Sequence, residues 1–359
     1  MKYAPVLIPT VCRYQHFRNC IESLSQCTWA DKTDVFVAVD YPGCKEHWEG
    51  YRKIREYLEN CGNMGFKSLN VTFREMNYFF SGKGNIGTLM RDVEKTYDRY
   101  IASEDDNMFA SNFLVYMNSC LEAFEDDPDV VMVSGYSYPV EWDVSDGATC
   151  LKQNFNASVW GAGFWSKKRA TFIPYIRSGA MLDDVSQVIR DKTYLRMTDA
   201  SLREYIPASV TPWRKLFRFI MVISDIGLRA YLAVAGKYVI TPSISKVRNC
   251  GFDGSGQYCQ TIEQKENGNT AGTYRYSQQP IDQKDTFEIH LNTKDSLQEN
   301  RDRLNRFDVR TPAQMMRTRL YLWLMTHFGV WAGKACAMIL FPFDFGLRAW
   351  RKIWRTIRK

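Results

Sequence analysis

The chain has 359 residues, of which 45% are hydrophobic and 24% charged, which is the composition of a globular protein and excludes a disordered one. Its formal net charge is +7, and the excess of Lys and Arg gathers in the stretch from Arg317 to Lys359, where acids are rare. A basic end of this kind predicts an anionic partner, either nucleic acid or an anionic membrane.

Short apolar runs alternate with amphipathic segments over the first 135 residues. The runs predicted to be strands are Tyr3–Thr10, Val35–Val39, Leu69–Phe73, Tyr100–Ser103 and Val130–Ser134. The segments predicted to be helices are Arg18–Ser25, Trp48–Asn60, Asn85–Tyr97 and Asn112–Glu125. This alternation predicts an α/β fold, a mostly parallel sheet flanked by helices on both faces.

The pattern is less regular after Glu141. The sequence predicts helices at Met181–Leu195 and Lys215–Val234, and a strand at Tyr238–Ile240. The segment Glu263–Thr293 is polar and poor in aliphatic residues, so we expect it at the surface.

The stretch Arg319–Lys359 forms a tail of different composition. Its Trp323, Trp331, Trp350 and Trp354 stand among aliphatic and basic residues, and His327 and Lys334 interrupt its apolar run. A membrane-spanning helix needs about 20 apolar residues with few charges. We therefore expect one or two amphipathic helices that lie on a membrane surface, with a core-packing helix as the main alternative and a spanning helix as a weaker one.

Ten cysteines are present, and none forms a CxxC pair, which argues against a zinc ribbon. The N-terminal residues lack the charged and apolar regions of a signal peptide. These features predict mostly free thiols in the cytoplasm. Together with the basic tail, they predict a peripheral position at the inner face of the plasma membrane.

Acidic residues follow two of the predicted strands. Asp40 ends one of them, and the run Glu104-Asp105-Asp106 follows another. Ligands of open parallel sheets bind at the carboxyl ends of strands, and carboxylates there are suitable ligands for a hard divalent cation. A solvated acidic loop, or acids that favour a helix N-terminus, would explain the same triplet.

The segment Ile101–Phe113 resembles the metal site of the inverting N-acetylglucosaminyltransferase that begins complex N-glycans, and of bacterial family 2 glycosyltransferases. Pro5–Thr10, running into Arg13, resembles the opening strand of these enzymes and its nucleotide-binding Arg. Val37–Asp40 resembles a strand that ends in an acid contacting uracil. Ile244–Gly256, with its final Asp-Gly-Ser-Gly, resembles a loop that closes over the donor. The resemblance covers residues 3 to 260 and implies the GT-A fold.

The resemblance also implies roles for individual residues. Asp106 would bind the metal directly, and Glu104 and Asp105 would support it through water or the sugar. Arg13 and Asp40 would hold the nucleotide base. A surface charge at Arg13 and a turn-forming Asp before Pro42-Gly43 are the alternatives.

Two glycine-rich stretches are candidates for the donor site. Ser81–Gly87 precedes a helix, where backbone N–H groups suit phosphate, so we place Asn85 and Arg91 near the nucleotide, with a plain glycine turn as the alternative. Gly251–Gly256, which contains Asp253, would be a mobile lid that excludes water.

The residues that would activate and contact the acceptor sugar are predicted from weaker local patterns. Asp225 stands at about the place of the family's catalytic base, although the family's Trp and paired acids are missing around it. Asp183-Asp184 is the rival for this role, and a helix cap is the structural alternative for Asp225. The glycines and the two Trp of Trp160–Trp165 suit a wall for the acceptor sugar, or alternatively core packing.

These expectations combine into one predicted function. Residues 1–135 would bind the nucleotide sugar, 136–310 would carry the acceptor site and lid, and 311–359 would associate with a membrane. The chain would be a hexosyl- or N-acetylhexosaminyltransferase that uses Mn2+ or Mg2+ and a UDP-sugar. It would transfer the sugar with inversion to a glycan or lipid-linked saccharide in surface polysaccharide synthesis, and it would not bind nucleic acid. A nucleotidyltransferase and a non-enzymatic nucleic-acid or membrane-binding module are the alternatives.

Overall fold

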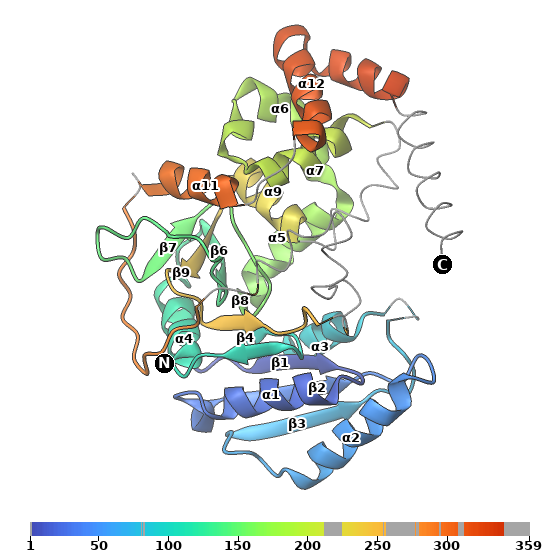
Figure 1. Ribbon diagram of the computed structural model, residues 1–359, viewed down its shortest axis with the longest axis vertical. Coiled ribbons are helices and arrows are strands. Elements are labelled where there is room, and N and C mark those ends of the chain that lie inside the picture. Colours follow the sequence, from blue (N-terminus) through green and yellow to red (C-terminus); the bar gives the residue numbers. More distant parts are fainter. Residues whose placement is uncertain are drawn as a thin grey trace. The chain divides into compact units, whose positions relative to one another are not determined.

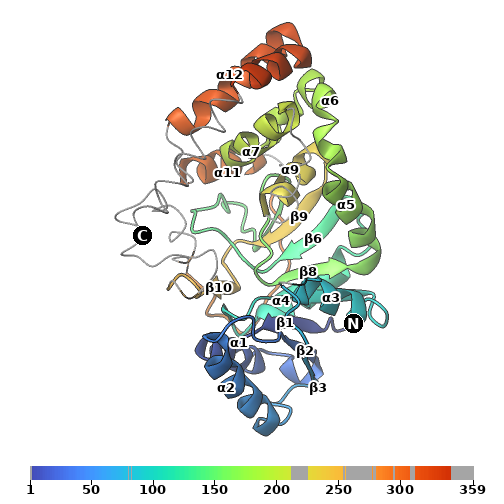
Figure 2. The same ribbon diagram turned by 90° about the vertical axis from the view of Figure 1, so that its right-hand side faces the viewer.

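The computed structural model describes residues 2–79, 81, 83–211, 225–253, 255, 277, 280–293, 296–307 and 312–340. The chain separates into two compact units (Figures 1 and 2). Unit 1 comprises Met1–Ala170 and Tyr238–Phe307, and unit 2 comprises Thr171–Lys237 and Asp308–Lys359. Within the described residues, no helix combines the length and the apolar character that crossing a membrane would require.

Unit 1 is built on an eight-stranded sheet with the order β3-β2-β1-β4-β8-β6-β9-β7. The strands are β1 (Val6–Thr10), β2 (Asp34–Val39), β3 (Ser68–Phe73), β4 (Arg99–Ala102), β6 (Val130–Ser134), β7 (Cys150–Gln153), β8 (Ala162–Trp165) and β9 (Tyr238–Pro242). The four strands from β3 to β4 are parallel, and so are β6 and β9. The predicted mostly parallel α/β sheet is therefore confirmed.

Four helices pack on this sheet, at the positions that the apolar periodicity predicts: α1 (Tyr14–Ser25), α2 (His47–Asn60), α3 (Asn85–Val93) and α4 (Phe113–Ala123). Buried side chains of α1, α2 and α4 join one core with β1 and β2. Figure 2 shows α1 and α2 on the same side of β1, β2 and β3, whereas α3 packs against β1, β2 and β4.

Two strands of the sheet run against their neighbours, which the sequence does not reveal. β8 lies between β4 and β6 and is antiparallel to both, and β7 is antiparallel to β9. Both are only four residues long, too short to show a clear alternation. A separate antiparallel ribbon pairs β5 (Asn107–Phe109) with β10 (Val247–Asn249).

Helix α11 (Ser296–Phe307) completes the secondary structure of unit 1. Its Leu304 packs in a second core with aromatic residues of the segment 136–155: Tyr136, Tyr138, Trp142 and Phe155. The segment expected to be superficial, Glu263–Thr293, is described only in part, and it contains one buried acid, Asp282.

Unit 2 is helical in its described part. It contains η2 (Ala180–Leu182), α6 (Val185–Arg190), η3 (Thr193–Arg196), α7 (Asp199–Val210), α9 (Asp225–Ala235) and α12 (Pro312–Phe328). Helix α5 (Ser166–Ser178) begins in unit 1 and continues into unit 2. The single helix predicted at Met181–Leu195 is wrong, because short turns of 3-10 helix flank α6 and Lys192 takes a left-handed conformation between them. Of the helix predicted at Lys215–Val234, residues 215–224 lie outside the described residues and the rest belongs to α9.

Candidate functional site

The site lies where the strand order of the sheet reverses, between β1 and β4. Strands β1, β2 and β3 follow one another toward one edge, whereas β4 lies on the other side of β1. The carboxyl ends of β1 and β4 therefore open between diverging connections, which is where open α/β sheets bind ligands. β1 ends at Thr10 and β4 at Ala102, and the Ser103 N–H donates to the Leu7 carbonyl at 2.9 Å. This pairing places the acidic run beside the segment that carries Arg13.

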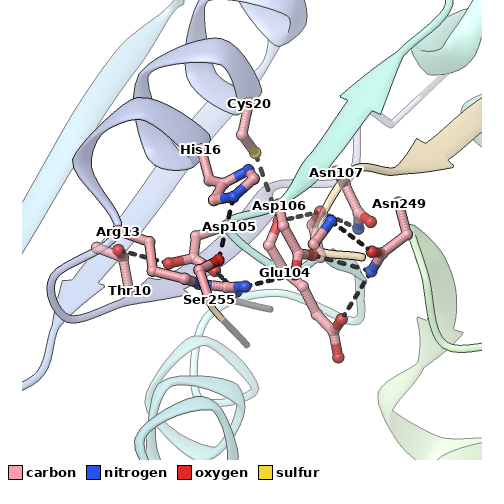
Figure 3. A network of polar contacts seen from close by, with 12 residues as sticks. Thr10, Arg13, His16, Cys20, Glu104, Asp105, Asp106, Asn107, Asn249 and Ser255 are labelled. Atoms are coloured by element: carbon pink, nitrogen blue, oxygen red, sulfur yellow. Dashed lines mark hydrogen bonds and ion pairs between the residues drawn. The ribbon is translucent and has the colours of Figure 1, made fainter. Parts of the chain in front are cut away.

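Two buried carboxylates meet one guanidinium in this position (Figure 3). Arg13 donates to Asp105 through Nη2, and its Nη1 lies 2.8 Å from Asp106 Oδ2. The Thr10 hydroxyl donates to the second oxygen of Asp105 at 2.8 Å. Both acids are 5% exposed. Asp105 and Asp106 therefore form a buried, paired network and do not belong to a solvated loop.

Close packing of helix α2 fixes the backbone just before Arg13. A Cβ atom at Gly50 would lie 1.7 Å from the Cys12 carbonyl oxygen, so only glycine allows α2 to approach this closely. The approach holds the turn between β1 and α1, from which Arg13 extends toward the acids.

The opposite wall of the site comes from β10, more than 140 residues later in the chain. Asn249 pairs with Asn107 in the two-stranded ribbon, and its Nδ2 donates to Asp106 Oδ1 at 2.9 Å. The Cys250 N–H donates to the Asp106 carbonyl at 2.7 Å. A Cβ atom at Gly251 would lie 2.1 Å from Asp106 Oδ2, so this backbone touches the carboxylate directly. The loop after β10 thus closes over Asp106.

Burial and the neighbouring charges have opposing effects on the pKa values of Asp105 and Arg13. Burial raises the pKa of Asp105, and the negative charge of Asp106 adds to that rise, although Arg13 and the Thr10 hydroxyl oppose it. For Arg13, burial would lower the pKa, but the charges of Asp105 and Asp106 outweigh it and raise the pKa. The guanidinium therefore stays charged, and it balances much of the negative charge of the pair.

The donor set at Asp106 suits a hard cation that the protein and a substrate share. Within the described residues, no three His, Cys, Asp or Glu side chains are grouped so as to hold a metal ion. However, Mg2+-type sites often use only one or two protein carboxylates, together with phosphate oxygens and water. Asp106 offers such a carboxylate, and Glu104 extends in the same direction, 3.4 Å from Asn249. The residues therefore fit a metal bound jointly by Asp106 and a diphosphate, and they do not fit a cage made by the protein alone.

Asp40 lies at the carboxyl end of β2, as predicted, and is 5% exposed. Its Oδ1 accepts from the N–H groups of Tyr41 and Tyr78 at 3.0 and 2.8 Å, and its Oδ2 accepts from Phe79 N–H at 3.3 Å. Asp40 therefore shapes the loop after β3. Its predicted contact with the nucleotide base stays a prediction.

Asn85 and Arg91 lie on α3 and differ in their surroundings. Asn85 donates to the Ala38 carbonyl at 2.7 Å and accepts from Arg74 at 3.0 Å, so it connects the ends of β2 and β3 to this helix. Arg91 is exposed, and the bond that its guanidinium makes is with Thr88 on the same helix. The structure does not join either residue to the acidic network, and their proximity to a nucleotide stays a prediction.

Asp253 lies in the glycine-rich loop and contacts helix α1. Its carboxylate is 2.8 Å from His16 Nε2 and accepts from the Ser255 N–H and hydroxyl at 2.9 and 2.6 Å. Burial would raise the pKa of Asp253, but the Ser255 and His16 contacts outweigh it and lower the pKa to about 2. The loop is therefore fastened one helical turn away from Arg13.

Asp225, Asp184 and Trp165 were predicted to act on or contact the acceptor sugar, and the structure gives a different result for each. Asp225 is the first residue of α9, and its side chain lies outside the described residues, so its role as a base stays a prediction. The rival Asp184 accepts a hydrogen bond from the Tyr175 hydroxyl in unit 2. Trp165 is a core residue, because it is 3% exposed and its indole N–H donates to the Leu121 carbonyl. For Trp165 the acceptor-wall interpretation is therefore wrong, and the core alternative holds.

Sequence reasoning missed Thr10, His16, Asn249 and the close approach of Gly251. The acids and Arg13 stand at the ends of recognisable strands, but Asn249 belongs to a three-residue strand without a pattern of its own. Asn249 and Gly251 lie within Ile244–Gly256, and the resemblance of this segment to a loop that covers the donor was the signal that could have identified them.

No protein-family model matches the chain, and a search of curated proteins returned no match. Among solved structures, the chain is similar to the mannosyltransferase PcManGT from Pyrobaculum calidifontis, which was solved with GDP-Man and Mn2+. The sequence identity is 14% and the TM-score is 0.33, over 47% of this chain and 46% of that one, so less than half of that protein's length is matched. It is also similar to residues 1–349 of S. aureus TarS, with 11% identity and a TM-score of 0.38 over 91% of this chain and 81% of that one. A third structure, mouse xyloside xylosyltransferase 1, has 10% identity and a TM-score of 0.29 over 47% of this chain and 69% of that one. These likenesses are loose.

Proposed function

We propose that this chain is a glycosyltransferase that moves a sugar from a nucleoside diphosphate donor to a glycan or a lipid-linked saccharide. The observation that carries the proposal is the pair Asp105 and Asp106, buried beside Arg13 at the carboxyl ends of adjacent parallel strands. One guanidinium faces two buried carboxylates, which leaves a negative charge for a ligand cation to balance, and this position in the sheet is where nucleotides bind.

The charges of the site suit the departure of a nucleoside diphosphate. A divalent cation, Mn2+ or Mg2+, would be held by Asp106 and would neutralise the charge that develops on the leaving diphosphate. Asp105 holds the guanidinium of Arg13 in place beside this site. Asn249 fixes the orientation of the Asp106 carboxylate from the other side.

The identity of the nucleotide and the inversion of the sugar's configuration are proposed from the sequence resemblance. We propose UDP as the nucleotide, with Arg13 and Asp40 at the base, and a hexosyl or N-acetylhexosaminyl group as the transferred sugar. Inversion would need a carboxylate that removes the proton of the acceptor hydroxyl, and Asp225 is the candidate. The segment Gly251–Gly256 would cover the donor and exclude water, which favours transfer over hydrolysis.

Titration calorimetry with UDP, in the presence and absence of Mn2+, tests the proposal. We expect UDP to bind much more tightly with Mn2+ than without it. Asp106→Asn should abolish the difference, because it removes the charge of the carboxylate and keeps its shape. Asp92→Asn is the matched control, since Asp92 is an exposed acid of α3 that pairs with Lys95.

Two results would overturn the proposal. One is UDP binding with the same affinity in both conditions for the wild type and Asp106→Asn. The other is tight, salt-sensitive binding of RNA by a protein that has no affinity for nucleotides. Once binding is established, the release of free sugar from a panel of nucleotide sugars would identify the donor.

A further inference from the structure

Helix α12 in unit 2 uses one of its faces for internal packing. Met315, Thr318, Tyr321 and Met325 lie at helical spacing and are at most 3% exposed. This face contacts α7, and Figure 2 shows the two helices side by side. This face therefore supplies the buried side chains by which α12 packs within unit 2.

The rest of α12, and the helical residues 330–340 that follow it, carry large apolar side chains on their exposed surface. The exposed fractions are 70% for Met316, 40% for Leu320, 49% for Trp323, 54% for Phe328, 70% for Trp331, 60% for Met338 and 69% for Ile339. We call these seven residues the exposed apolar face. They make up seven of the seventeen exposed large hydrophobic residues of the described chain. Single exposed apolar residues are ordinary, but a concentration of this kind indicates a binding surface.

The charge around this face favours one kind of partner. Residues 312–340 contain no Asp or Glu, and they contain Arg317, Arg319 and Lys334. The sequence continues with six more basic residues and one acid: Arg348, Arg351, Lys352, Arg355, Arg358, Lys359 and Asp344. A second copy of the chain would bring like charges together, whereas an anionic surface would complement them.

We propose that the exposed apolar face binds the surface of an anionic lipid bilayer, with α12 lying in the plane of the membrane. Trp323 and Trp331 would sit at the level of the headgroups, where the amphipathic indole ring is most favourable. Met316, Leu320, Met338 and Ile339 would enter the edge of the acyl region, and Arg319 and Lys334 would contact the headgroups. This binding does not depend on the proposed sugar transfer, and either can fail without the other.

Vesicle sedimentation with the full chain tests the proposal. Vesicles of phosphatidylcholine mixed with phosphatidylglycerol should pellet the wild type, and vesicles of phosphatidylcholine alone should pellet much less of it. The double variant Trp323→Ser/Trp331→Ser should partition about tenfold more weakly, because two large apolar contacts with the bilayer are lost. The pair Met338→Ser/Ile339→Ser should weaken binding in the same direction. Raising the salt concentration should release part of the wild type.

Trp48→Ser is the control, because Trp48 is also partly exposed, at 38%, but lies on α2 in unit 1. It should sediment with vesicles as the wild type does, and thermal unfolding should show that all variants are folded. Undiminished sedimentation of both folded double variants would overturn the proposal. A second result would also overturn it: the wild type forms a dimer and does not bind vesicles, and the double variants are monomers. The partner of the exposed apolar face would then be a second copy of the chain.

Discussion

At the scale of single residues, the contact between Gly251 and Asp106 shows how little space the site leaves. The Asp106 carboxylate is held by Arg13 on one oxygen and by Asn249 on the other. The backbone of Gly251 completes this enclosure because it carries no side chain. A carboxylate fixed in this way has one orientation, which is what a shared metal site needs.

Gly251→Ala should therefore damage the site more than the rest of the fold. The added methyl group would collide with Asp106 Oδ2, so the carboxylate or the loop must move. We expect UDP to bind about tenfold or more weakly in the presence of Mn2+, and a loss of about 1–3 kcal/mol in the free energy of unfolding. Calorimetry and urea unfolding measure the two effects.

Gly65→Ala provides the comparison for that prediction. Gly65 lies between α2 and β3 with a φ of +81°, and no atom lies within 4 Å of an added Cβ. This variant should bind UDP as the wild type does and lose about 1–2 kcal/mol of stability, because alanine is disfavoured in the left-handed conformation. Equal UDP affinity in both variants would show that Gly251 does not shape the site.

Arg99 shows that a buried arginine among acids is not in itself a functional site. It is 2% exposed and bonds Glu122 and Glu125, which attaches β4 to the end of α4. Its partners are more than 40% exposed, whereas the partners of Arg13 are buried. The difference lies in the acids: burial raises the pKa of Asp105, and groups with perturbed pKa values gather at functional sites.

At the scale of elements, a buried ion pair supports the β5–β10 ribbon. Lys246, just before β10, pairs with Asp282, and Asn112 at the start of α4 donates to the same carboxylate at 2.9 Å. The exposed fractions of Lys246 and Asp282 are 3% and 7%. The pair anchors the beginning of β10, so that Asn249 reaches Asp106 in a fixed register.

A second acid, Asp34, joins the beginnings of two strands and gives a pH-dependent prediction. It starts β2 and accepts hydrogen bonds from Lys67 at 2.8 Å and from Ser68, the first residue of β3, at 2.7 Å. Burial would raise the pKa of Asp34, but these hydrogen bonds and the Lys67 charge outweigh it and lower the pKa. A carboxyl group with a lowered pKa stabilises the fold above its unfolded pKa of about 3.9, and the contribution is lost as the pH falls through the folded pKa.

Asp34→Asn should therefore lower the free energy of unfolding by about 1 kcal/mol at neutral pH. The difference from the wild type should shrink as the pH falls below about 4, because the wild-type carboxyl is then protonated as well. Urea unfolding at neutral and acidic pH measures this change. Asp92→Asn, which removes an exposed partner of Lys95, should have little effect, and a difference at Asp34 that does not depend on pH would contradict the electrostatic explanation.

At the scale of the whole molecule, the residues that form the acidic network in the described part of the chain all belong to unit 1. Arg13, Asp105, Asp106 and Asn249 all lie within Met1–Ala170 and Tyr238–Phe307. Helix α12 and the exposed apolar face belong to unit 2. Nucleotide binding and membrane binding should therefore be separable.

A chain that ends at Phe307 should keep Mn2+-dependent UDP binding and lose vesicle binding. Removal of α12 should destabilise unit 2, because α7 loses its packing partner, so we expect a lower unfolding temperature for part of the molecule. Calorimetry, vesicle sedimentation and thermal unfolding measure the three effects. If the shortened chain still unfolds cooperatively but no longer binds UDP, the site needs residues beyond unit 1.

The sequence by itself determined the elements of the N-terminal half and the placement of its acids. Apolar runs such as Val35–Val39 and the helical periodicity of 48–60 are local signals, and both elements formed where they were expected. A parallel arrangement brings strand ends to one edge, so the position of Asp40 and of the acidic run at that edge followed from the pattern. The pairing of Arg13 with Asp105 and Asp106 was not predicted. The catalytic base did not follow in the same way, and Asp225 stays a prediction.

Only the tertiary structure decided which distant residues complete the site. Asn249 and Gly251 reach Asp106 because β10 pairs with β5, which lies more than 130 residues earlier in the chain. Strands of three residues are too short to show a periodic pattern, so the sequence does not predict this pairing. The antiparallel insertion of β8 is equally invisible, since parallel and antiparallel neighbours bury similar short apolar runs. Pairing, register and close backbone contact depend on the whole chain at once, and a local pattern contains no information about them.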